Sequence, residues 1–403
     1  MPRKVFTAGE VLAAADVNEY LMDQTVMSFA GTAARGSAIG TAVEGMVTYL
    51  NDSDSLELYN GSAWVSATPS SGAATNAIIN GAFEVNQRNF TSSTAGNYGF
   101  DRWDTARSGG TVTASSETFT LGAAPVAGIE AKNYQRTVTS GQSASSDYAV
   151  LVQKIEDVRS FAGQTVTVSF YARSGSGTPK IGIELFQNFG TGGSPSADVS
   201  TALGAPTIST AWTRYTATVA IPSISGKTLG TTNNNYLGLG LWVSAGSTFN
   251  TRASSIGIQN NTFDIWGVQV EAGSTATPFR RNANSLQGEL AACQRYYFRN
   301  TPGNTQGMLA QGSAFGTTGA FILVNLPVTM RALASSVDFS TLRLTDGVNN
   351  ITVTALTLTS GNVTTTQTVS VDATVASGLT QFRPYILQNG NSTAGFIGFS
   401  AEL

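Results

Sequence analysis

The chain has 403 residues, a length that predicts two or three domains. Only 12% of the residues are charged, the net charge is −3 at pH 7, and histidine is absent. This charge balance argues against a nucleic-acid-binding protein, which would present a basic face. The lack of histidine excludes His-dependent catalytic triads and His-containing zinc sites, and the single cysteine, Cys293, excludes an intramolecular disulfide.

The rest of the composition favours short strands joined by turns. The chain contains 43 glycines, and its 20 phenylalanines, 12 tyrosines and 5 tryptophans can fill β-sheet cores. No uninterrupted apolar run approaches the roughly 18 residues of a membrane-spanning helix, so we expect no membrane insertion. The N-terminus lacks the apolar core of a signal peptide, so we do not expect Sec export.

Residues 1–65 have a different pattern from the remainder of the chain. The first 30 residues are predicted to be helical, with Val17, Tyr20 and Leu21 on one narrow stripe. A helix this short is marginal alone, so the stripe is a candidate attachment interface with an outside partner. Residues 45–65 alternate as β-hairpins, with the Asn60-Gly61 turn signal between two strands.

A linker and a β-rich unit follow. Residues 66–75 are small and polar, which is typical of a linker. From 76 to 283 the sequence shows alternating strands, for example at 165–171 and 237–243, with no helical period between them. This pattern predicts an antiparallel β-sandwich.

A second helical signal marks a junction at 284–298. Asn284 is the predicted N-cap. The apolar stripe of this predicted helix consists of Leu286, Leu290, Cys293 and Tyr297. Because Cys293 lies on the stripe, we expect its thiol to be buried and unreactive. Residues 299–403 are predicted to form a further, distal β-domain, with Pro327 and Pro384 at strand ends or edges.

The stretch around Trp103 is a candidate site. Asp101 and Asp104 flank Arg102-Trp103, and acids beside aromatic residues suit a sugar-binding subsite. The same residues suit a structural loop in which Arg102 pairs with a carboxylate and Trp103 packs inward. A catalytic carboxylate pair is a third alternative.

Other aromatic residues can stack on sugar rings. Trp212 and Tyr215, at the start of a strand, are candidate glycan contacts. Trp242 and Trp266 lie in strongly alternating strands, which favours positions in the core.

Several short segments resemble bacteriophage tail proteins, and they occur in a specific order. FTAGEVLAAADVNEYLMDQ at 6–24 and EGMVTYLNDSDSLELYNGSAW at 44–64 resemble the N-terminal segment of minor tail and tail-fibre proteins. VEAGSTATPFRR at 270–281 and ELAACQRYY at 289–297 resemble a junction of phage appendage proteins. LPVTMRA at 326–332 is similar to the start of the terminal β-domain after that junction.

This resemblance implies a structural virion protein, a tail fibre or receptor-binding minor tail protein that mediates adhesion to the host. It implies partners among other tail or baseplate proteins, a homotrimer, and a host cell-surface glycan as receptor. The chain would be assembled into the tail in the host cytoplasm. Residues 1–65 would then be the virion-attachment segment.

The middle unit, with NGAFE at 80–84 and FDIWGVQVE at 263–271, is similar to jelly-roll carbohydrate-binding modules. In such modules carboxylates from the first and last strands help to bind a structural calcium, and the matching residues are Glu84 and Asp264. The chain departs from that pattern because Ile265 stands where a second aspartate is common. No other cofactor is expected.

Two other functions remain open. A virion-associated glycan depolymerase requires a carboxylate-lined cleft, and a bacterial surface carbohydrate-binding module requires an anchor or export signal. The sequence favours a protein that is not an enzyme, because it has no histidine and no convincing pair of catalytic carboxylates.

Overall fold

The computed structural model describes residues 11, 13, 26–67, 76–96, 98–126, 129–361 and 363–403. The chain divides into two compact units, Met1–Ala74 and Thr75–Leu403. The predicted stripe of Val17, Tyr20 and Leu21 lies outside the described residues. No helix in the described ranges is long and apolar enough to cross a membrane.

The first unit is built on a four-stranded sheet in the order β1-β2-β3-β4. Its elements are β1 (Met27–Phe29), α2 (Thr32–Ala38), β2 (Val47–Leu50), β3 (Ser55–Tyr59) and β4 (Trp64–Ser66). The two predicted hairpins are confirmed, since β2 pairs with β3 and β3 with β4, both antiparallel. The prediction of helix through residue 30 is wrong at β1, which instead pairs with β2 in parallel.

One charged side chain ties α2 to this sheet. Arg35 is buried, forms an ion pair with Glu57 and donates to Thr48 Oγ1 at 3.2 Å. Its guanidinium lies 4.3 Å from the ring centroid of Trp64. A small sheet has little apolar area to bury, so these polar contacts fix the helix against it.

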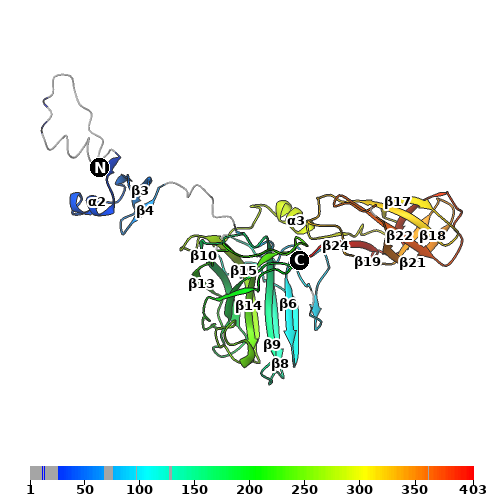
Figure 1. Cartoon of the computed structure of the whole chain (residues 1–403), viewed down its shortest axis with the longest axis horizontal. Coiled ribbons are helices and arrows are strands. Elements are labelled where there is room, and N and C mark those ends of the chain that lie inside the picture. The colour runs from blue at the N-terminus through cyan, green and yellow to red at the C-terminus, as the bar shows by residue number, and fades with distance from the viewer. Residues whose placement is uncertain are drawn as a thin grey trace. The chain divides into compact units, whose positions relative to one another are not determined.

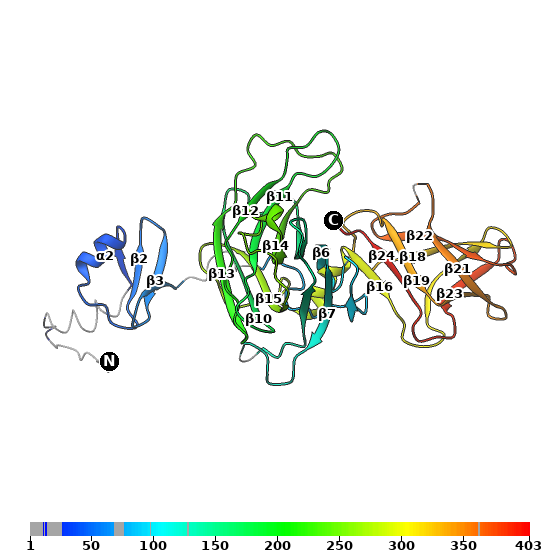
Figure 2. The ribbon, with the colours of Figure 1, turned by 90° about the horizontal axis from the view of Figure 1, so that it is seen from below.

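The second unit begins with a two-sheet antiparallel sandwich (Figures 1 and 2). The six-stranded sheet has the order β13-β10-β15-β8-β7-β5, and the five-stranded sheet the order β12-β11-β14-β9-β6. The bounds are β5 (Ser92–Ser93), β6 (Asp104–Ser108), β7 (Thr111–Thr118), β8 (Asn133–Ser140), β9 (Tyr148–Glu156), β10 (Thr165–Ser174), β11 (Gly182–Asn188), β12 (Val199–Ala202), β13 (Thr213–Ala220), β14 (Tyr236–Ala245) and β15 (Thr262–Ala272). The predicted class, mainly β with an antiparallel jelly-roll-like sandwich, is confirmed.

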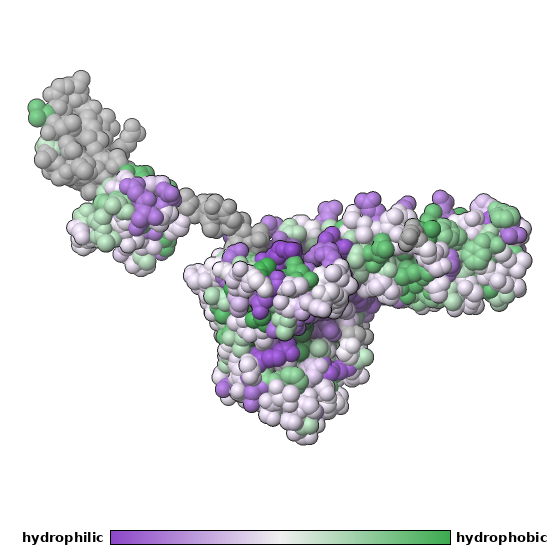
Figure 3. Space-filling view, in the orientation of Figure 1, coloured by the Kyte–Doolittle hydropathy of each residue, from purple (hydrophilic) through white to green (hydrophobic). Residues whose placement is uncertain are grey.

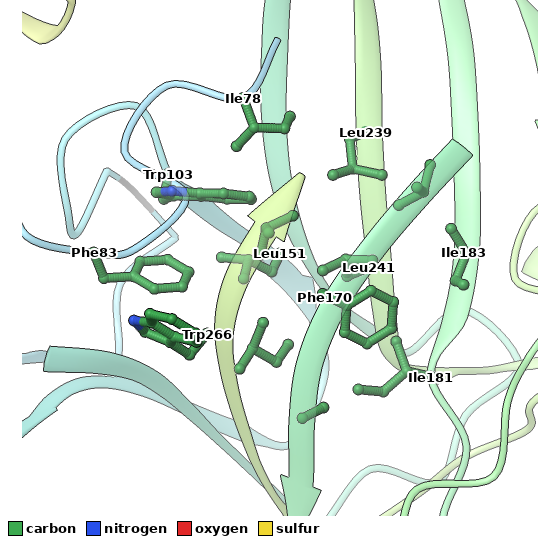
Figure 4. Close-up of a cluster of buried hydrophobic side chains, with 14 of the residues drawn as sticks. Ile78, Phe83, Trp103, Leu151, Phe170, Ile181, Ile183, Leu239, Leu241 and Trp266 are labelled. Atoms are coloured by element: carbon green, nitrogen blue, oxygen red, sulfur yellow. The ribbon is translucent and has the colours of Figure 1, made fainter. Parts of the chain in front are cut away.

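The sandwich core is made of alternate residues from both sheets. Phe170 from β10 lies close to Leu241 from β14, and both are fully buried (Figure 4). Burying one such side chain contributes about 1.5–3 kcal/mol, and the period of two places all the inward residues of a strand on the same face. The period-two signal in the sequence therefore predicted this core correctly.

The junction helix α3 (Leu286–Gln294) is shorter than predicted. Its N-cap is Ser285, which accepts a hydrogen bond from Gly288 N, and not Asn284, which has φ 57°. Leu286 and Leu290 are exposed, so the predicted apolar stripe is wrong for those two residues. Cys293 is fully buried as predicted, and burial raises the pKa of its thiol well above the ordinary value.

The distal region has a small sheet and a closed barrel. The sheet has the order β16-β24-β19 and the barrel the order β17-β18-β22-β21-β20-β23. The bounds are β16 (Tyr297–Asn300), β17 (Met308–Ala314), β18 (Gly319–Asn325), β19 (Ser336–Ser340), β20 (Leu342–Thr345), β21 (Asn350–Leu358), β22 (Thr368–Val375), β23 (Pro384–Asn389) and β24 (Phe396–Ser400). Pro384 opens β23 and Pro327 follows β18, as predicted.

The C-terminal residues bind the sandwich through buried charges. Glu402 forms ion pairs with Arg102 and with Arg88, the latter at 3.3 Å. The Arg102 side chain is 1% exposed and lies 3.5 Å from the ring centroid of Tyr296. Arg102 also has φ 71°, a left-handed backbone that a non-glycine residue keeps only where its surroundings fix it.

We expect Glu402→Gln to lower the free energy of unfolding by about 3 kcal/mol or more, because it removes the carboxylate that pairs with the buried Arg102, whereas Arg88 keeps Asp101 at 3.8 Å. Guanidinium denaturation of the full chain measures this change. The matched control is Glu117→Gln, which removes a half-exposed partner of Arg136 at 3.6 Å and should change stability by less than about 0.5 kcal/mol. Equal small effects from both variants would contradict a structural role for Glu402.

Candidate functional site

The strongest candidate site is a trough on the outer face of the five-stranded sheet. Strand β14 sends its leucines into the core, so its alternate positions lie on the outer face. Those positions are Tyr236, Gly238, Gly240 and Trp242. Two of the four have no side chain, and side chains of the neighbouring residues close over both glycines, which are buried.

Neighbouring strands provide the edges of this trough. Gly240 lies between Glu184 of β11 and Val152 of β9 in the strand register. One step along, Gly238 lies between Phe186 and Lys154. A Cβ added at Gly238 would come within 2.2 Å of the Phe186 ring, so that ring lies directly across the glycine.

At one end the trough deepens into a hollow of about 160 Å³. Its lining residues are Ala106, Tyr148, Val150, Val152, Glu184, Phe186, Gly240, Trp242, Phe249 and Arg252. Figure 3 views this side of the sandwich, and hydrophilic and hydrophobic residues lie side by side over β14 and β9. The lining therefore combines aromatic surface with a few polar groups.

Aromatic rings form one wall of the hollow. Trp242 is 2% exposed because Phe249 and Tyr148 cover it, with ring centroids 5.3 and 5.9 Å away. Phe249 belongs to a 3-10 turn (Ser247–Phe249) directly after β14, which places its ring over the end of the strand. Tyr148 and Phe249 are themselves only half-buried, so they present the accessible aromatic surface.

Glu184 is the buried charge of the site. It accepts from Arg252 Nε at 2.7 Å and Nη2 at 3.2 Å, and from Trp242 Nε1 at 2.9 Å. The carboxylate is 0% exposed, whereas the Arg252 side chain is 43% exposed. The ion pair with Arg252 therefore neutralises the charge of Glu184 inside the protein. The Arg252 guanidinium is the group of this pair that a ligand can reach.

Two more ionisable groups lie further along the trough. Burial raises the pKa of Asp104, and one of its carboxylate oxygens has no hydrogen-bond partner among the described residues. Burial lowers the pKa of Lys154, whose ammonium lies 5.0 Å from the Tyr236 ring and donates to the Leu403 carbonyl oxygen. Aromatic faces flanked by such groups can hold a flat ring that carries hydroxyl groups.

The structure buries two of the predicted glycan contacts, Trp103 and Asp101, so both predictions are corrected. Trp103 is 1% exposed, packs 5.2 Å from Phe83 and donates to the Asn80 carbonyl oxygen at 2.9 Å. Asp101 is fully buried and accepts from the backbone and side-chain nitrogens of Gln87, both at 2.7 Å. Neither side chain has surface to offer a ligand, and the structural-loop alternative describes both residues.

The other two predicted contacts, Trp212 and Tyr215, pack against different neighbours. Trp212 is half-buried against Phe119 and Tyr134, each 5.3 Å away. Tyr215 packs on the core residue Phe170, and its hydroxyl oxygen accepts from Ser209 N. The two rings pack against different neighbours, and glycan contact by Trp212 and Tyr215 stays a prediction.

Arginines bind both carboxylates of the predicted calcium site. Glu84 pairs with Arg281 at 2.5 and 2.7 Å. Asp264 pairs with Arg136 at 2.7 Å and with Arg173 at 2.8 Å. Within the ranges that the structure describes, no three Asp, Glu or Cys residues gather as metal ligands. These arginines supply the positive charge that a shared calcium would bring.

Sequence reasoning missed Glu184, Phe186, Phe249 and Arg252. The signal that could have found the trough is the Gly-Leu-Gly-Leu alternation at 238–241, because glycine on one face of a strand marks a close approach or an open surface. No local signal links Arg252 to Glu184, which is 68 residues away.

No protein-family model and no curated protein matches the chain. Among solved structures, the CBM22-2 xylan-binding domain from Paenibacillus barcinonensis Xyn10C aligns at 15% identity over 44% of this chain and 94% of its own, with a TM-score of 0.28. The family 11 carbohydrate-binding module from Clostridium thermocellum, in complex with a mixed-linked tetrasaccharide, aligns at 11% identity over 47% and 99%, with a TM-score of 0.27. These TM-scores are too low to support an argument, so the β-sandwich is assigned from the sheets of this chain itself.

Proposed function

We propose that the trough on the five-stranded sheet binds glycans and that the chain is an adhesive, structural component of a bacteriophage tail. The observation that carries the glycan proposal is the hollow of about 160 Å³ in this trough, where half-buried aromatic rings lie beside the Arg252 guanidinium. Gly240 lines this hollow and adds no side chain to it. Tyr148 and Phe249 offer a ligand ring surface, and Arg252 offers hydrogen-bond donors.

The arrangement of carboxylates supports binding without cleavage. Glu184 and Asp104 belong to strands on opposite sides of β14 and β9, and Gly240 and Val152 stand between them in the strand register. Glu184 is also fully engaged by Arg252 and Trp242, which leaves it poorly suited to proton transfer.

The virion role is supported by the ordered resemblance at 6–24, 44–64 and 270–281. The first unit, Met1–Ala74, is compact by itself, which suits an attachment element joined to the adhesive part by the linker at 66–75. Val17, Tyr20 and Leu21 are proposed to contact other tail or baseplate proteins. A homotrimer assembled into the tail in the host cytoplasm would sum weak contacts with a host cell-surface glycan into firm adhesion.

We expect Phe249→Ala to weaken glycan binding about tenfold or more, because it removes accessible ring surface from the hollow. A printed glycan array selects the ligand, and isothermal titration of the full chain measures the affinity. The matched control is Phe382→Ala, which removes an 80% exposed phenylalanine from the barrel.

Unchanged affinity in the Phe249→Ala chain would contradict binding in the trough. Release of reducing ends from the selected glycan, abolished by Asp104→Asn, would contradict the non-catalytic part of the proposal and favour a depolymerase.

We also expect a chain that starts at Thr75 to keep its glycan affinity but to be absent from phage particles. Complementing a phage that lacks this gene and blotting purified virions measures incorporation. The full-length Phe249→Ala chain is the matched control and should be incorporated normally. Normal incorporation of the shortened chain would place attachment outside residues 1–74.

A further inference from the structure

The hollow beside Trp242 is closed at one end by aromatic rings. Tyr148 and Phe249 have ring centroids 4.8 Å apart, and both rings contact Trp242 at the end of strand β14. Both residues line the hollow. A ligand chain that ran along the strand would meet these rings and could not continue past them without rising out of the hollow.

The Phe186 ring closes the opposite end. It lies directly across Gly238, where an added Cβ would come within 2.2 Å of it. Its centroid is 5.8 Å from that of Tyr236, the next outward residue of β14, so rings cover the strand beyond this point. Gly238 and Trp242 are four residues apart, a rise of about 13 Å, and the rings at both ends take up part of that length.

The space between these two ends is small. Its volume is about 160 Å³, whereas pockets for drug-sized ligands begin at roughly 300 Å³. Gly240 lies on its floor, and Val150 and Val152 of β9 add only aliphatic surface beside it. A space of this size holds one pyranose ring but not two linked rings.

The polar wall of the hollow offers a donor and no free acceptor. Glu184 accepts from Ser200 Oγ at 2.5 Å, from Trp242 Nε1 at 2.9 Å, and from Arg252 Nε and Nη2 at 2.7 and 3.2 Å. A carboxylate has about four acceptor positions, so Glu184 has none left for a ligand hydroxyl. Nη1 of Arg252 takes no part in this pairing and remains available as a donor.

The Arg252 guanidinium is held at the rim between two rings. Its central carbon lies 5.1 Å from the ring centroid of Trp242 and 5.5 Å from that of Phe186. The buried Glu184 carboxylate fixes it from the protein side, while 43% of the arginine side chain stays exposed. A sugar ring in the hollow would therefore meet one donor in a fixed position.

We propose that this hollow binds the terminal sugar of a glycan and not a segment within the glycan chain. This inference rests on glycan binding in the trough. One pyranose ring stacks against Phe249 and Tyr148, and one of its oxygens accepts from Arg252 Nη1. A sugar within the chain carries a neighbour on both sides, and the closed ends of the hollow leave no path for the second one. A cell-surface glycan is attached through its reducing end, so the sugar bound is the non-reducing terminal one.

Displacement titrations of the full chain test this inference. The chain is loaded with the glycan selected on the array, and calorimetry follows its displacement by methyl pyranosides. These are the methyl pyranosides of glucose, galactose, mannose, rhamnose and N-acetylglucosamine, together with that of the glycan's own terminal sugar where it is another. The matched control is the same glycan trimmed of its non-reducing terminal sugar.

We expect the methyl pyranoside of the terminal sugar to bind within about tenfold of the affinity of the whole glycan, because the hollow contacts that sugar alone. The trimmed glycan should bind at least about tenfold more weakly than the intact one. Ala106→Leu, which fills the hollow from strand β6, should weaken the glycan and the methyl pyranoside by the same factor. Ala220→Leu, which enlarges an exposed alanine on the other sheet, should change neither affinity.

Equal binding of the intact and the trimmed glycan would overturn the inference, as would a bound glycan that no methyl pyranoside displaces. In both cases a loss of affinity in the Phe249→Ala chain would still support glycan binding in the trough. If no glycan on the array binds, or if Phe249→Ala leaves the affinity unchanged, glycan binding in the trough fails and the inference fails with it.

Discussion

The alternation of strand β14 is the constraint on which the sandwich depends. Its leucines at 237, 239 and 241 fill the core, while Gly238 and Gly240 on the other face leave room for side chains of the neighbouring strands. Any side chain at Gly238 would meet the Phe186 ring, and one at Gly240 would press on Glu184 and Val150. The same strand therefore fills the core on one side and holds the Phe186 ring and the Glu184 carboxylate on the other.

Buried carboxylates connect the remaining parts of the second unit. Glu184 holds Arg252 and Trp242 at the trough, and Glu402 holds Arg88 and Arg102 where the C-terminal residues reach the sandwich. Arginine side chains pair with each of these carboxylates inside the protein. Each of these ion pairs joins segments that lie far apart in the chain, so the charges act as structural ties between them.

Sequence patterns predicted the fold well where a local signal was decisive. The hairpin predicted from Asn60-Gly61 and the strand predicted from the leucine alternation at 237–243 are both confirmed. An Asn-Gly turn and a period of two are each compatible with few other local structures. Strand β17 has no such local signal, because Gly312 interrupts it. In the structure a Cβ at Gly312 would come within 1.8 Å of the Phe321 carbonyl oxygen, so the glycine is required by the neighbouring strand, which the sequence does not reveal.

The candidate site was harder to predict than the fold. Trp103 beside Asp101 has the composition of a sugar subsite, yet the left-handed backbone at Arg102 turns that segment into the core. The N-cap was assigned one residue early because Asn284 and Ser285 are both good caps, and only the backbone angles separate them. The residues around the trough come from strands that lie far apart in the chain. Only the pairing of these strands in the folded sheet brings them together, and the sequence does not reveal that pairing.

Hydrogen-exchange mass spectrometry of the full chain, with and without a glycan chosen from the array, tests the central claim most directly. The account predicts slower exchange in β14, in the adjoining segments of β9 and β11, and in residues 247–252, because a ligand in the trough covers them. Protection confined to the barrel at 299–403, with the five-stranded sheet unchanged, would contradict it.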